Sequence, residues 1–379
     1  MLQGILQEGL RMAGMIPLVD VKAQWEEVKE EVLSGWNEVL ETCNLFLGPN
    51  VRAFEQEFAS FCGVKFAKGI ASGTDALTLA LKAVGVEGKE VILPSLTFFA
   101  TAEAVVMAGG IPVFAEIEEK NYCISPEDVE RKITDKTRAV IVVHLYGHPA
   151  PVEKIKEIIG EREIYIIEDS AQAHGSRRDG KITGGMGNIA AFSFYISKNL
   201  SALGEAGCIT TNSRELADRI ELLRNHGQVS KYEHILIGTN SRLDELQAVV
   251  LRAKLKRLEE WNEKRQRIAQ FYLQELKDLP VILPEIESGC THTWHLFVVR
   301  TERRDGLFDY LRKKGIGCGI HYKVPCHLQP PMREYGYKEG MLPLTERITQ
   351  EVLSLPIYPH LKEEDAGRVI EEIRRFFNG

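Results

Sequence analysis

Short apolar runs alternate with stretches of helical spacing over the first two thirds of the chain. Strand-like runs lie at residues 91–93, 111–114, 139–144, 164–167 and 189–194. Between them, and over 21–43, apolar residues repeat every three or four positions, which is typical of helices. Strands that alternate with helices and are apolar on both faces predict an α/β fold, with a mainly parallel sheet between layers of helices.

The pattern changes from Val281, after a long helix. One helical repeat runs from about residue 243 to 276, long enough to bridge two domains. Residues 294–299 alternate like an antiparallel strand, and helical spacing returns at 304–314 and 363–377. A chain of 379 residues exceeds one average domain. We therefore expect an N-terminal extension at 1–15, a large domain at 16–250 and a smaller C-terminal α+β domain at 251–379.

Two ionisable side chains follow two of the predicted strands. Asp169 ends the stretch after 164–167, and Lys198 follows 189–194. Open α/β sheets bind ligands at the carboxyl edge of their strands. There a lysine can form a Schiff base and a carboxylate can hold a protonated ring nitrogen, which together predict a pyridoxal 5'-phosphate (PLP) site. Glu168 should point to the opposite face of its strand. The alternative is a solvated carboxylate and a surface lysine in a protein without PLP.

The segment ASGTDALTLAL, which begins at Ala71, predicts a strand, a turn and a helix. Ser72 or Thr74 can cap the helix, and Gly73 lets the backbone approach a ligand closely. The free N–H groups at such a helix start suit a phosphate group, although an ordinary helix cap has the same sequence. In PSLTFFATAEA, one of two phenylalanines can stack on a flat ring. The absence of GxGxxG after the first strand and of GxxxxGK[ST] disfavours dinucleotide and P-loop sites.

Composition excludes several other classes of function. The net charge of -7 gives no basic footprint for nucleic acid. Seven scattered cysteines without a CxxC pair predict neither a disulfide framework nor a metal site. Because no apolar run is long enough for a membrane span and the N-terminus makes a poor signal peptide, we expect a cytoplasmic protein.

Six ordered motifs resemble one enzyme family. They are EDSAQAHGS, FSFYISKNL, ASGTDALTLAL, PSLTFFATAEA, NHG and NSRLDELQA. Together they are similar to the PLP-dependent nucleotide-sugar aminotransferases of the DegT/StrS type, within the fold-type I aspartate aminotransferase superfamily. The resemblance runs from IPLVDVKAQ at Ile16 to LPIYPH at Leu355. It implies a seven-stranded-type sheet in the large domain, a smaller C-terminal domain and a homodimer with active sites shared between subunits.

The resemblance also implies roles for individual residues. Lys198 would bind PLP covalently and then move a proton between substrate and cofactor. Asp169 would pair with the ring nitrogen, Gln172 would hydrogen-bond the ring hydroxyl and Phe98 would stack on the ring. The phosphate would be held by Gly73, Thr74 and Ser193, together with Asn240 of the neighbouring subunit. Three residues look like substrate contacts: Arg242, His321 and Tyr322.

The reaction implied by the resemblance is transamination of a keto-sugar nucleotide, with L-glutamate as amino donor. Its amino-sugar product would serve surface polysaccharide or glycoconjugate biosynthesis. The sequences KYEH at Lys231, RLDELQ at Arg242 and EWNEKR at Glu260 resemble members that act on 3-keto sugars. A 4-keto substrate is the first alternative. A PLP-binding regulatory protein without transaminase turnover is an alternative of another class.

Overall fold

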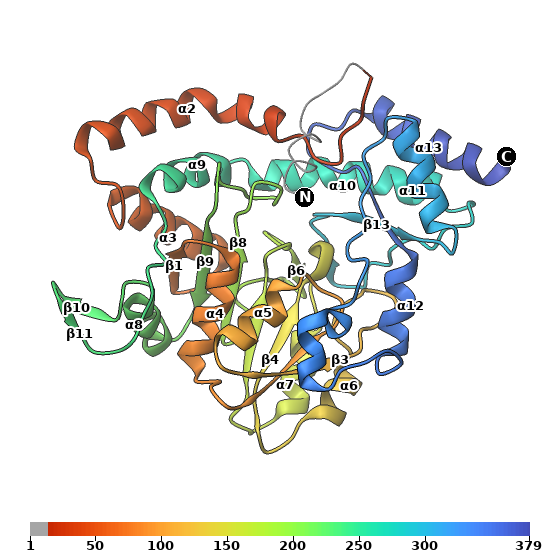
Figure 1. The fold of residues 1–379 in the computed structure, drawn as a ribbon. Coiled ribbons are helices and arrows are strands. Elements are labelled where there is room, and N and C mark those ends of the chain that lie inside the picture. Colours follow the sequence, from red (N-terminus) through yellow and green to blue (C-terminus); the bar gives the residue numbers. More distant parts are fainter. Residues whose placement is uncertain (1–13) are drawn as a thin grey trace.

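The computed structural model describes residues 14–379, and its centre is a seven-stranded sheet. The strands follow the order β1 (Phe66–Ile70), β9 (Gly207–Thr211), β8 (Ile189–Ser193), β5 (Tyr165–Asp169), β4 (Thr137–Val143), β2 (Glu90–Pro94) and β3 (Ile111–Ala115). Neighbours from β8 to β3 are parallel, whereas β9 is antiparallel to both β1 and β8. The predicted mainly parallel sheet is confirmed (Figure 1).

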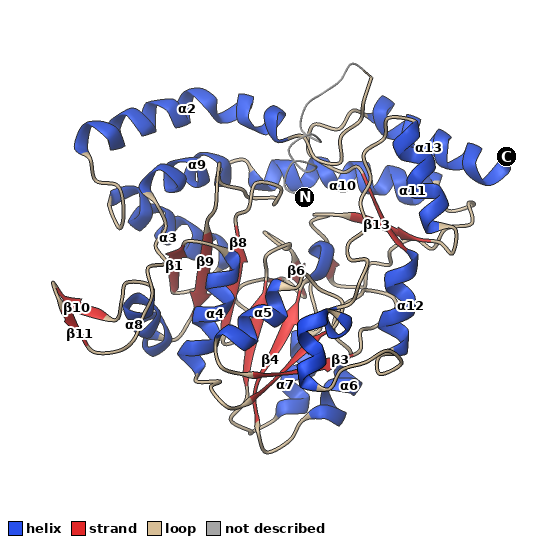
Figure 2. Ribbon diagram, viewed as in Figure 1, coloured by secondary structure: helices blue, strands red, loops and turns tan. Residues whose placement is uncertain are grey.

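Helices cover both faces of this sheet (Figure 2). On one face Ile141 and Ile167 share a core with α4 (Gly73–Val84), α5 (Ala100–Met107) and α8 (Arg214–Leu223). On the other face Val140 and Ile166 pack with α6 (Pro126–Lys132) and α7 (Val152–Ile159). Adjacent residues of one strand thus enter different cores, because side chains alternate across a sheet. Further along the sheet, Phe192 packs with α3 (Pro49–Cys62) and α9 (Glu245–Leu255).

The prediction of one long helix over 243–276 is wrong in one respect, because two helices cover this range. α9 ends at Leu255, and α10 (Leu258–Glu275) begins after two intervening residues. At the break, the Arg257 N–H donates to the Lys254 carbonyl at 3.0 Å, a tighter turn than that of an α-helix. The buried Lys254 side chain donates to Ser201 Oγ at 2.9 Å. The apolar spacing alone does not reveal this turn.

A second core lies beyond α10. It joins α10 to β13 (Phe297–Arg300), β14 (Val352–Leu355), α11 (Arg304–Lys313) and α13 (Glu363–Asn378), and it includes Ile16. β13 and β14 are antiparallel, as expected, but β13 starts later than the predicted 294–299. Trp294 has a φ of 50°, which an extended strand does not allow. The domain boundary at 250 stays a prediction, and residues 1–13 of the predicted extension lie outside the described residues.

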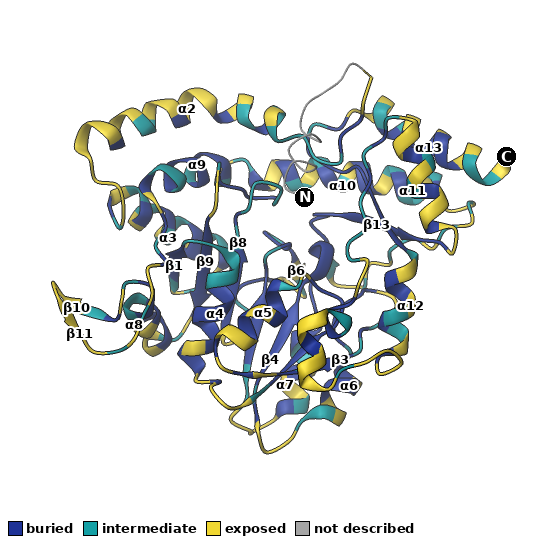
Figure 3. Ribbon diagram, in the orientation of Figure 1, coloured by how far each residue is buried: buried dark blue, intermediate teal, exposed yellow. Residues whose placement is uncertain are grey.

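The remaining elements lie around these two cores. α2 (Val21–Thr42) packs on α9, and α12 (Pro343–Glu351) precedes β14. Two small sheets form from β12 (Cys290–Thr291), β6 (Arg177–Arg178) and β7 (Lys181–Ile182), and from β10 (Gln228–Ser230) and β11 (Glu233–His234). Short 3-10 helices are η1 (Leu145–Gly147), η2 (Cys326–Leu328) and η3 (Pro330–Tyr335). The β10–β11 hairpin is largely exposed (Figure 3). None of the helices in residues 14–379 has the length and apolarity that crossing a membrane requires.

Candidate active site

Lys198 lies in the turn that follows β8, where its N–H donates to the Tyr195 carbonyl at 2.8 Å. Its amine forms no hydrogen bond or ion pair with any residue in 14–379. Burial lowers the pKa of Lys198 to about 8, and the nearby Asp169 carboxylate opposes that shift. A lysine with such a pKa is partly neutral near physiological pH, as a nucleophilic amine must be.

Asp169 is the last residue of β5 and is buried. Its carboxylate accepts hydrogen bonds from Thr101 Oγ1 at 2.8 Å and from the Ala171 N–H at 3.2 Å. Burial raises the pKa of Asp169, while these two donors and Lys198 act in the opposite direction. Within residues 14–379, no lysine or arginine nitrogen lies within 4.0 Å of this carboxylate. Asp169 is therefore a buried acid whose negative charge is not neutralised by a salt bridge.

Gln172 is held in one orientation by its neighbours. Its Oε1 accepts the Tyr146 N–H at 2.7 Å, and its Nε2 donates to the Tyr322 hydroxyl at 3.0 Å. The Tyr322 ring lies 5.7 Å from the Phe98 ring, at an angle of 41°. Phe98 lies two residues before the start of α5 and is 57% exposed, so it offers a ring face to a ligand. Gln172, Tyr322 and Phe98 thus line one place from three distant parts of the chain.

The start of α4 lies against the end of β8. Ser72 caps this helix by accepting the Asp75 N–H at 3.1 Å. A Cβ placed on Gly73 would lie 2.5 Å from the Ser193 Cβ, so only glycine allows this approach. The first N–H groups of a helix, here those of Gly73 and Thr74, have no acceptor within the helix. With Ser193, they form a cradle suited to an anion.

Of the remaining predicted residues, His321 adjoins this place, whereas Arg242 and Asn240 have other contacts. His321 Nδ1 is 2.8 Å from Ser354 Oγ, and the His321 carbonyl accepts the Tyr146 hydroxyl. Burial lowers the pKa of His321 to about 4, and Lys198 adds to this shift. Arg242 donates to Asn225 Oδ1 at 3.3 Å. Asn240 is exposed and forms a β-bridge with Asn225, and no contact brings it to the other predicted site residues of its own chain.

Sequence reasoning missed two site residues. Thr101 donates to Asp169, and the Tyr146 backbone orients Gln172. A signal for Thr101 was present, since Thr97 and Thr101 flank Phe98 at the spacing of one helical turn. The Tyr146 contact joins residues 26 positions apart, and only the folded sheet reveals it.

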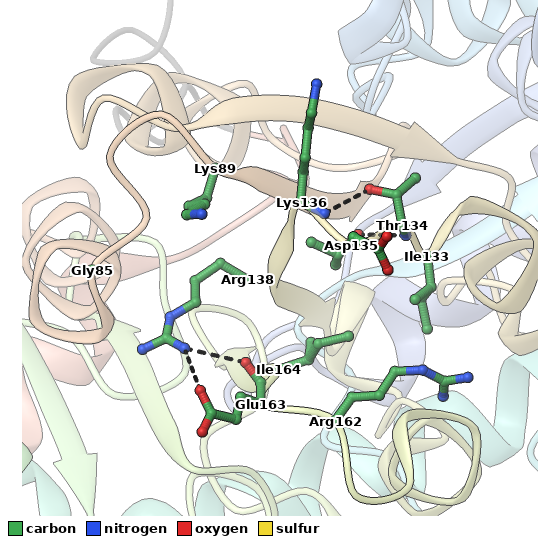
Figure 4. Close-up of a pocket in the computed structure, with 11 residues that line it drawn as sticks. Gly85, Lys89, Ile133, Thr134, Asp135, Lys136, Arg138, Arg162, Glu163 and Ile164 are labelled. Carbon is green, nitrogen blue, oxygen red and sulfur yellow. Dashed lines mark hydrogen bonds and ion pairs between the residues drawn. The ribbon is translucent and has the colours of Figure 1, made fainter.

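A hollow lies at the opposite edge of the sheet, away from Lys198 and Asp169 (Figure 4). It is lined by Lys89, Lys136, Arg138 and Arg162 near the amino ends of β2, β4 and β5. Arg138 is held by the Val84 and Glu163 carbonyls. Lys136 and Arg162 extend in different directions in Figure 4, so the cations do not converge on one point. Residues 14–379 also contain no group of three side chains able to hold a metal ion.

The residues at the carboxyl edge fit PLP. PLP needs an amine, an acid for its ring nitrogen and an anion site for its phosphate. Lys198 provides a partly neutral amine, Asp169 a buried acid without a salt bridge, and Gly73 a cradle that a Cβ would fill.

Comparison with known proteins supports the same cofactor. The model of the DegT/DnrJ/EryC1/StrS aminotransferase family matches residues 26–374. The dTDP-3-amino-3,4,6-trideoxy-alpha-D-glucose transaminase of Streptomyces venezuelae is 45% identical over 363 residues, which are 95% of this chain and 96% of that protein. A pleiotropic regulatory protein of Geobacillus stearothermophilus is 40% identical over 366 residues, 96% of this chain and 98% of the relative.

A solved structure agrees with these matches. The structure of S. venezuelae DesV in complex with a ketimine intermediate has a TM-score of 0.94 and 44% identity, covering 97% of this chain and 100% of the other. The chain belongs to the DegT/DnrJ/EryC1/StrS aminotransferase family and is a PLP-dependent aminotransferase.

Proposed function

We propose that this protein transfers an amino group from L-glutamate to the carbonyl carbon of a keto-sugar nucleotide. The observation that carries the proposal is the meeting of Lys198 and Asp169 at the carboxyl edge of the sheet. The amine is partly neutral and the acid is buried without a salt bridge. PLP bound there supplies an electron sink for a carbanion at the substrate carbon.

Lys198 has two tasks in this proposal. It binds the cofactor covalently, which requires a neutral amine. When it is not bound to the cofactor, its Nζ would be able to take a proton from the substrate carbon and to return it. A pKa of about 8 suits both tasks, because such an amine both gains and loses a proton near neutral pH.

Asp169, Gln172 and Phe98 orient the cofactor ring. The Asp169 carboxylate keeps a proton on the ring nitrogen. Gln172 has its Oε1 fixed by Tyr146, so its Nε2 is the end that is free to donate to the ring hydroxyl as well as to Tyr322. Phe98, which is exposed, would cover one ring face, while Gly73, Thr74 and Ser193 would hold the phosphate.

A homodimer with shared active sites follows from the same proposal. Asn240 is exposed and lies beside the β10–β11 hairpin, whose tip and flanks expose Val229, Tyr232, Ile235 and Ile237. Exposed apolar groups of this kind mark protein–protein contacts. Asn240 would reach the cofactor phosphate of the neighbouring subunit, and Arg242, His321 and Tyr322 would contact substrate.

We assign C3 of the sugar as the site of amination. The support is the 45% identical relative, named for a 3-amino sugar, together with the 3-keto-like segments noted in the sequence. A 4-keto substrate is the alternative. In either case the amino-sugar nucleotide would enter polysaccharide or glycoconjugate synthesis in the cytoplasm.

A second candidate function is regulation by a PLP-binding protein without turnover. The relative named as a pleiotropic regulatory protein favours it. That reading predicts bound PLP that glutamate does not aminate.

A spectroscopic half-reaction tests the proposal. Purified protein loaded with PLP is mixed with glutamate, and the absorbance band of the lysine-bound cofactor should convert to that of the aminated cofactor. A panel of 3-keto and 4-keto nucleotide sugars should then restore the first band, with the 3-keto compounds most effective. No conversion with glutamate or other amino acids would support the regulatory function instead. Restoration by 4-keto compounds alone would overturn the C3 assignment.

A further inference from the structure

A chain of two buried hydroxyl groups ends on Asp169. Thr97 Oγ1 lies 2.9 Å from Thr101 Oγ1, which donates to Asp169 Oδ2 at 2.8 Å. Both threonines are almost fully buried, at 3% and 1% exposure. Thr97 is part of the loop after β2 and Thr101 of the first turn of α5, so the two residues lie on either side of Phe98 in the sequence.

The direction of the protons in this chain is fixed by chemistry. An ionised carboxylate accepts hydrogen bonds only, and a hydroxyl has a single proton to donate. The Thr101 hydroxyl therefore donates its one hydrogen bond to Asp169, and Thr97 must be the donor to Thr101. Both hydroxyl groups thus point their protons toward the acid, which is the arrangement that favours its ionised form.

Thr101 departs from what a buried helical threonine usually does. Such a hydroxyl commonly donates to the carbonyl four residues earlier. Thr78 in α4 does so, donating to the Thr74 carbonyl at 2.9 Å. For Thr101 the equivalent carbonyl is that of Thr97, which accepts the Cys326 thiol at 3.3 Å instead. The Thr101 hydroxyl instead donates to Asp169 at the end of β5.

Few other groups act on Asp169. The Ala171 N–H is its second donor, and the charges that affect it are those of Lys198 and His144. The Tyr322 hydroxyl also senses the Asp169 charge. Thr101 is thus the one side chain within residues 14–379 that donates a hydrogen bond to this carboxylate.

We propose that Thr101, oriented by Thr97, is a positioning residue that keeps Asp169 ionised and aimed at the ring nitrogen of PLP, and so sets the protonation of that nitrogen. The inference rests on the proposed role of Asp169. It adds a buried residue that acts through the acid.

The test compares Thr101→Val, which keeps the shape and loses the donor, with Thr101→Ser, which keeps the donor. Each protein is loaded with PLP labelled with ¹⁵N in the ring, and the ring-nitrogen resonance and the pH titration of the lysine-bound absorbance band are recorded. Thr101→Val should shift the resonance toward the neutral ring and slow the glutamate half-reaction about 10- to 100-fold, the value of one hydrogen bond to a charged group. Thr101→Ser should restore both.

Two further variants keep the inference open to contradiction. Thr97→Val should shift the resonance in the same direction but less. This variant replaces Thr101→Val in the test if Thr101→Val does not fold. Thr349→Val changes a buried threonine of α12 whose hydroxyl donates to the Glu346 carbonyl, and it should leave the resonance unchanged. An unchanged resonance in Thr101→Val, or a serine variant as impaired as the valine variant, would overturn the inference. Because the resonance is read without any amino donor, it reports on Thr101 even if the protein proves not to transaminate.

Discussion

Glu168 and Asp169 are adjacent on β5, yet their carboxylates lie on opposite faces of the sheet and are bonded very differently. Asp169 accepts two hydrogen bonds, from Thr101 and Ala171. Glu168 accepts four, at 2.6–2.9 Å, from His144 Nε2 and from the backbone N–H groups of Gly184, Met186 and Gly187. Both acids are buried, but only Glu168 has its roughly four acceptor positions filled by the protein.

This difference indicates that Glu168 stabilises the fold and that Asp169 binds a ligand. Glu168 ties the ends of β4 and β5 to the loop before β8, and the Ala150 N–H holds His144 in the matching tautomer by donating to its Nδ1 at 2.9 Å. Asp169 can accept a further donor, and Lys198 lies near it. Buried carboxylates are costly unless paired, so an incompletely paired one indicates function.

The largest expected effect is that of Lys198→Ala. Loss of the group that moves the proton should slow the glutamate half-reaction by about 10²- to 10⁴-fold. Lys254 provides a matched control, because it is a second buried lysine whose pKa burial lowers to about 8. Stopped-flow absorbance should show Lys254→Met within about threefold of the parent protein. Equal losses in both variants would remove the special role of Lys198.

Asp169→Asn should come next. It keeps the shape and removes the negative charge, so the half-reaction should slow by about 10²-fold, as when one electrostatic contact to the reacting group is lost. Glu168→Gln, measured in the same assay, should slow it less than about tenfold, since it acts only through the backbone. A larger loss for Glu168→Gln than for Asp169→Asn would reverse the comparison between the two faces.

Stability should show the opposite order. Glu168→Gln brings an NH₂ group against N–H donors, and urea denaturation should show unfolding easier by about 3 kcal/mol. Asp169→Asn should change the free energy of unfolding by less than about 1 kcal/mol, because burial already disfavours its charge. Comparable destabilisation by both variants would mean that Asp169 is structural as well.

Gly73→Ala tests the phosphate cradle. The added Cβ would lie 2.5 Å from the Ser193 Cβ, and relief of such an overlap costs about 1–3 kcal/mol. Equilibrium titration should show weaker PLP binding by a corresponding factor. Gly367→Ala is the control, since nothing lies within 4 Å of its Cβ position in α13. Undiminished PLP affinity in Gly73→Ala would place the phosphate elsewhere.

The smallest effect is on pH dependence. The pKa of Lys198 is lowered on folding from 10.5 to about 8. Covalent capture of PLP by the cofactor-free protein should therefore rise as pH passes through about 8. The unfolded chain binds this proton more tightly, so Lys198 destabilises the fold below pH 8, and that penalty disappears as pH approaches 10.5. Capture that is flat between pH 6 and about 9 would contradict the lowered pKa.

Sequence patterns predict the local parts of this structure and miss the parts that depend on distant contacts. The strands that end at Asp169 and Ser193 were placed within a few residues, because a buried strand is apolar until it reaches the polar edge. The start of β13 was missed because Trp294 adopts a left-handed conformation that its alternating neighbours do not reveal. The break at Arg257 was missed for a similar reason, since the helical spacing continues across it.

The site shows the same division. Lys198, Asp169 and Gly73 have local signals, namely strand ends and a helix start. The bond from Thr101 to Asp169 spans 68 positions, and the bond from Gln172 to Tyr322 spans 150. These partners meet only because parallel strands bring their carboxyl ends to one edge and because the segment after the second core returns to it.

The most direct test of the central claim locates the cofactor on the chain. The PLP-loaded protein is reduced with borohydride, digested and mapped by mass spectrometry. The account predicts a reduced PLP adduct on Lys198 and unmodified Lys254. An adduct on Lys254 or another lysine, with Lys198 unmodified, would contradict it.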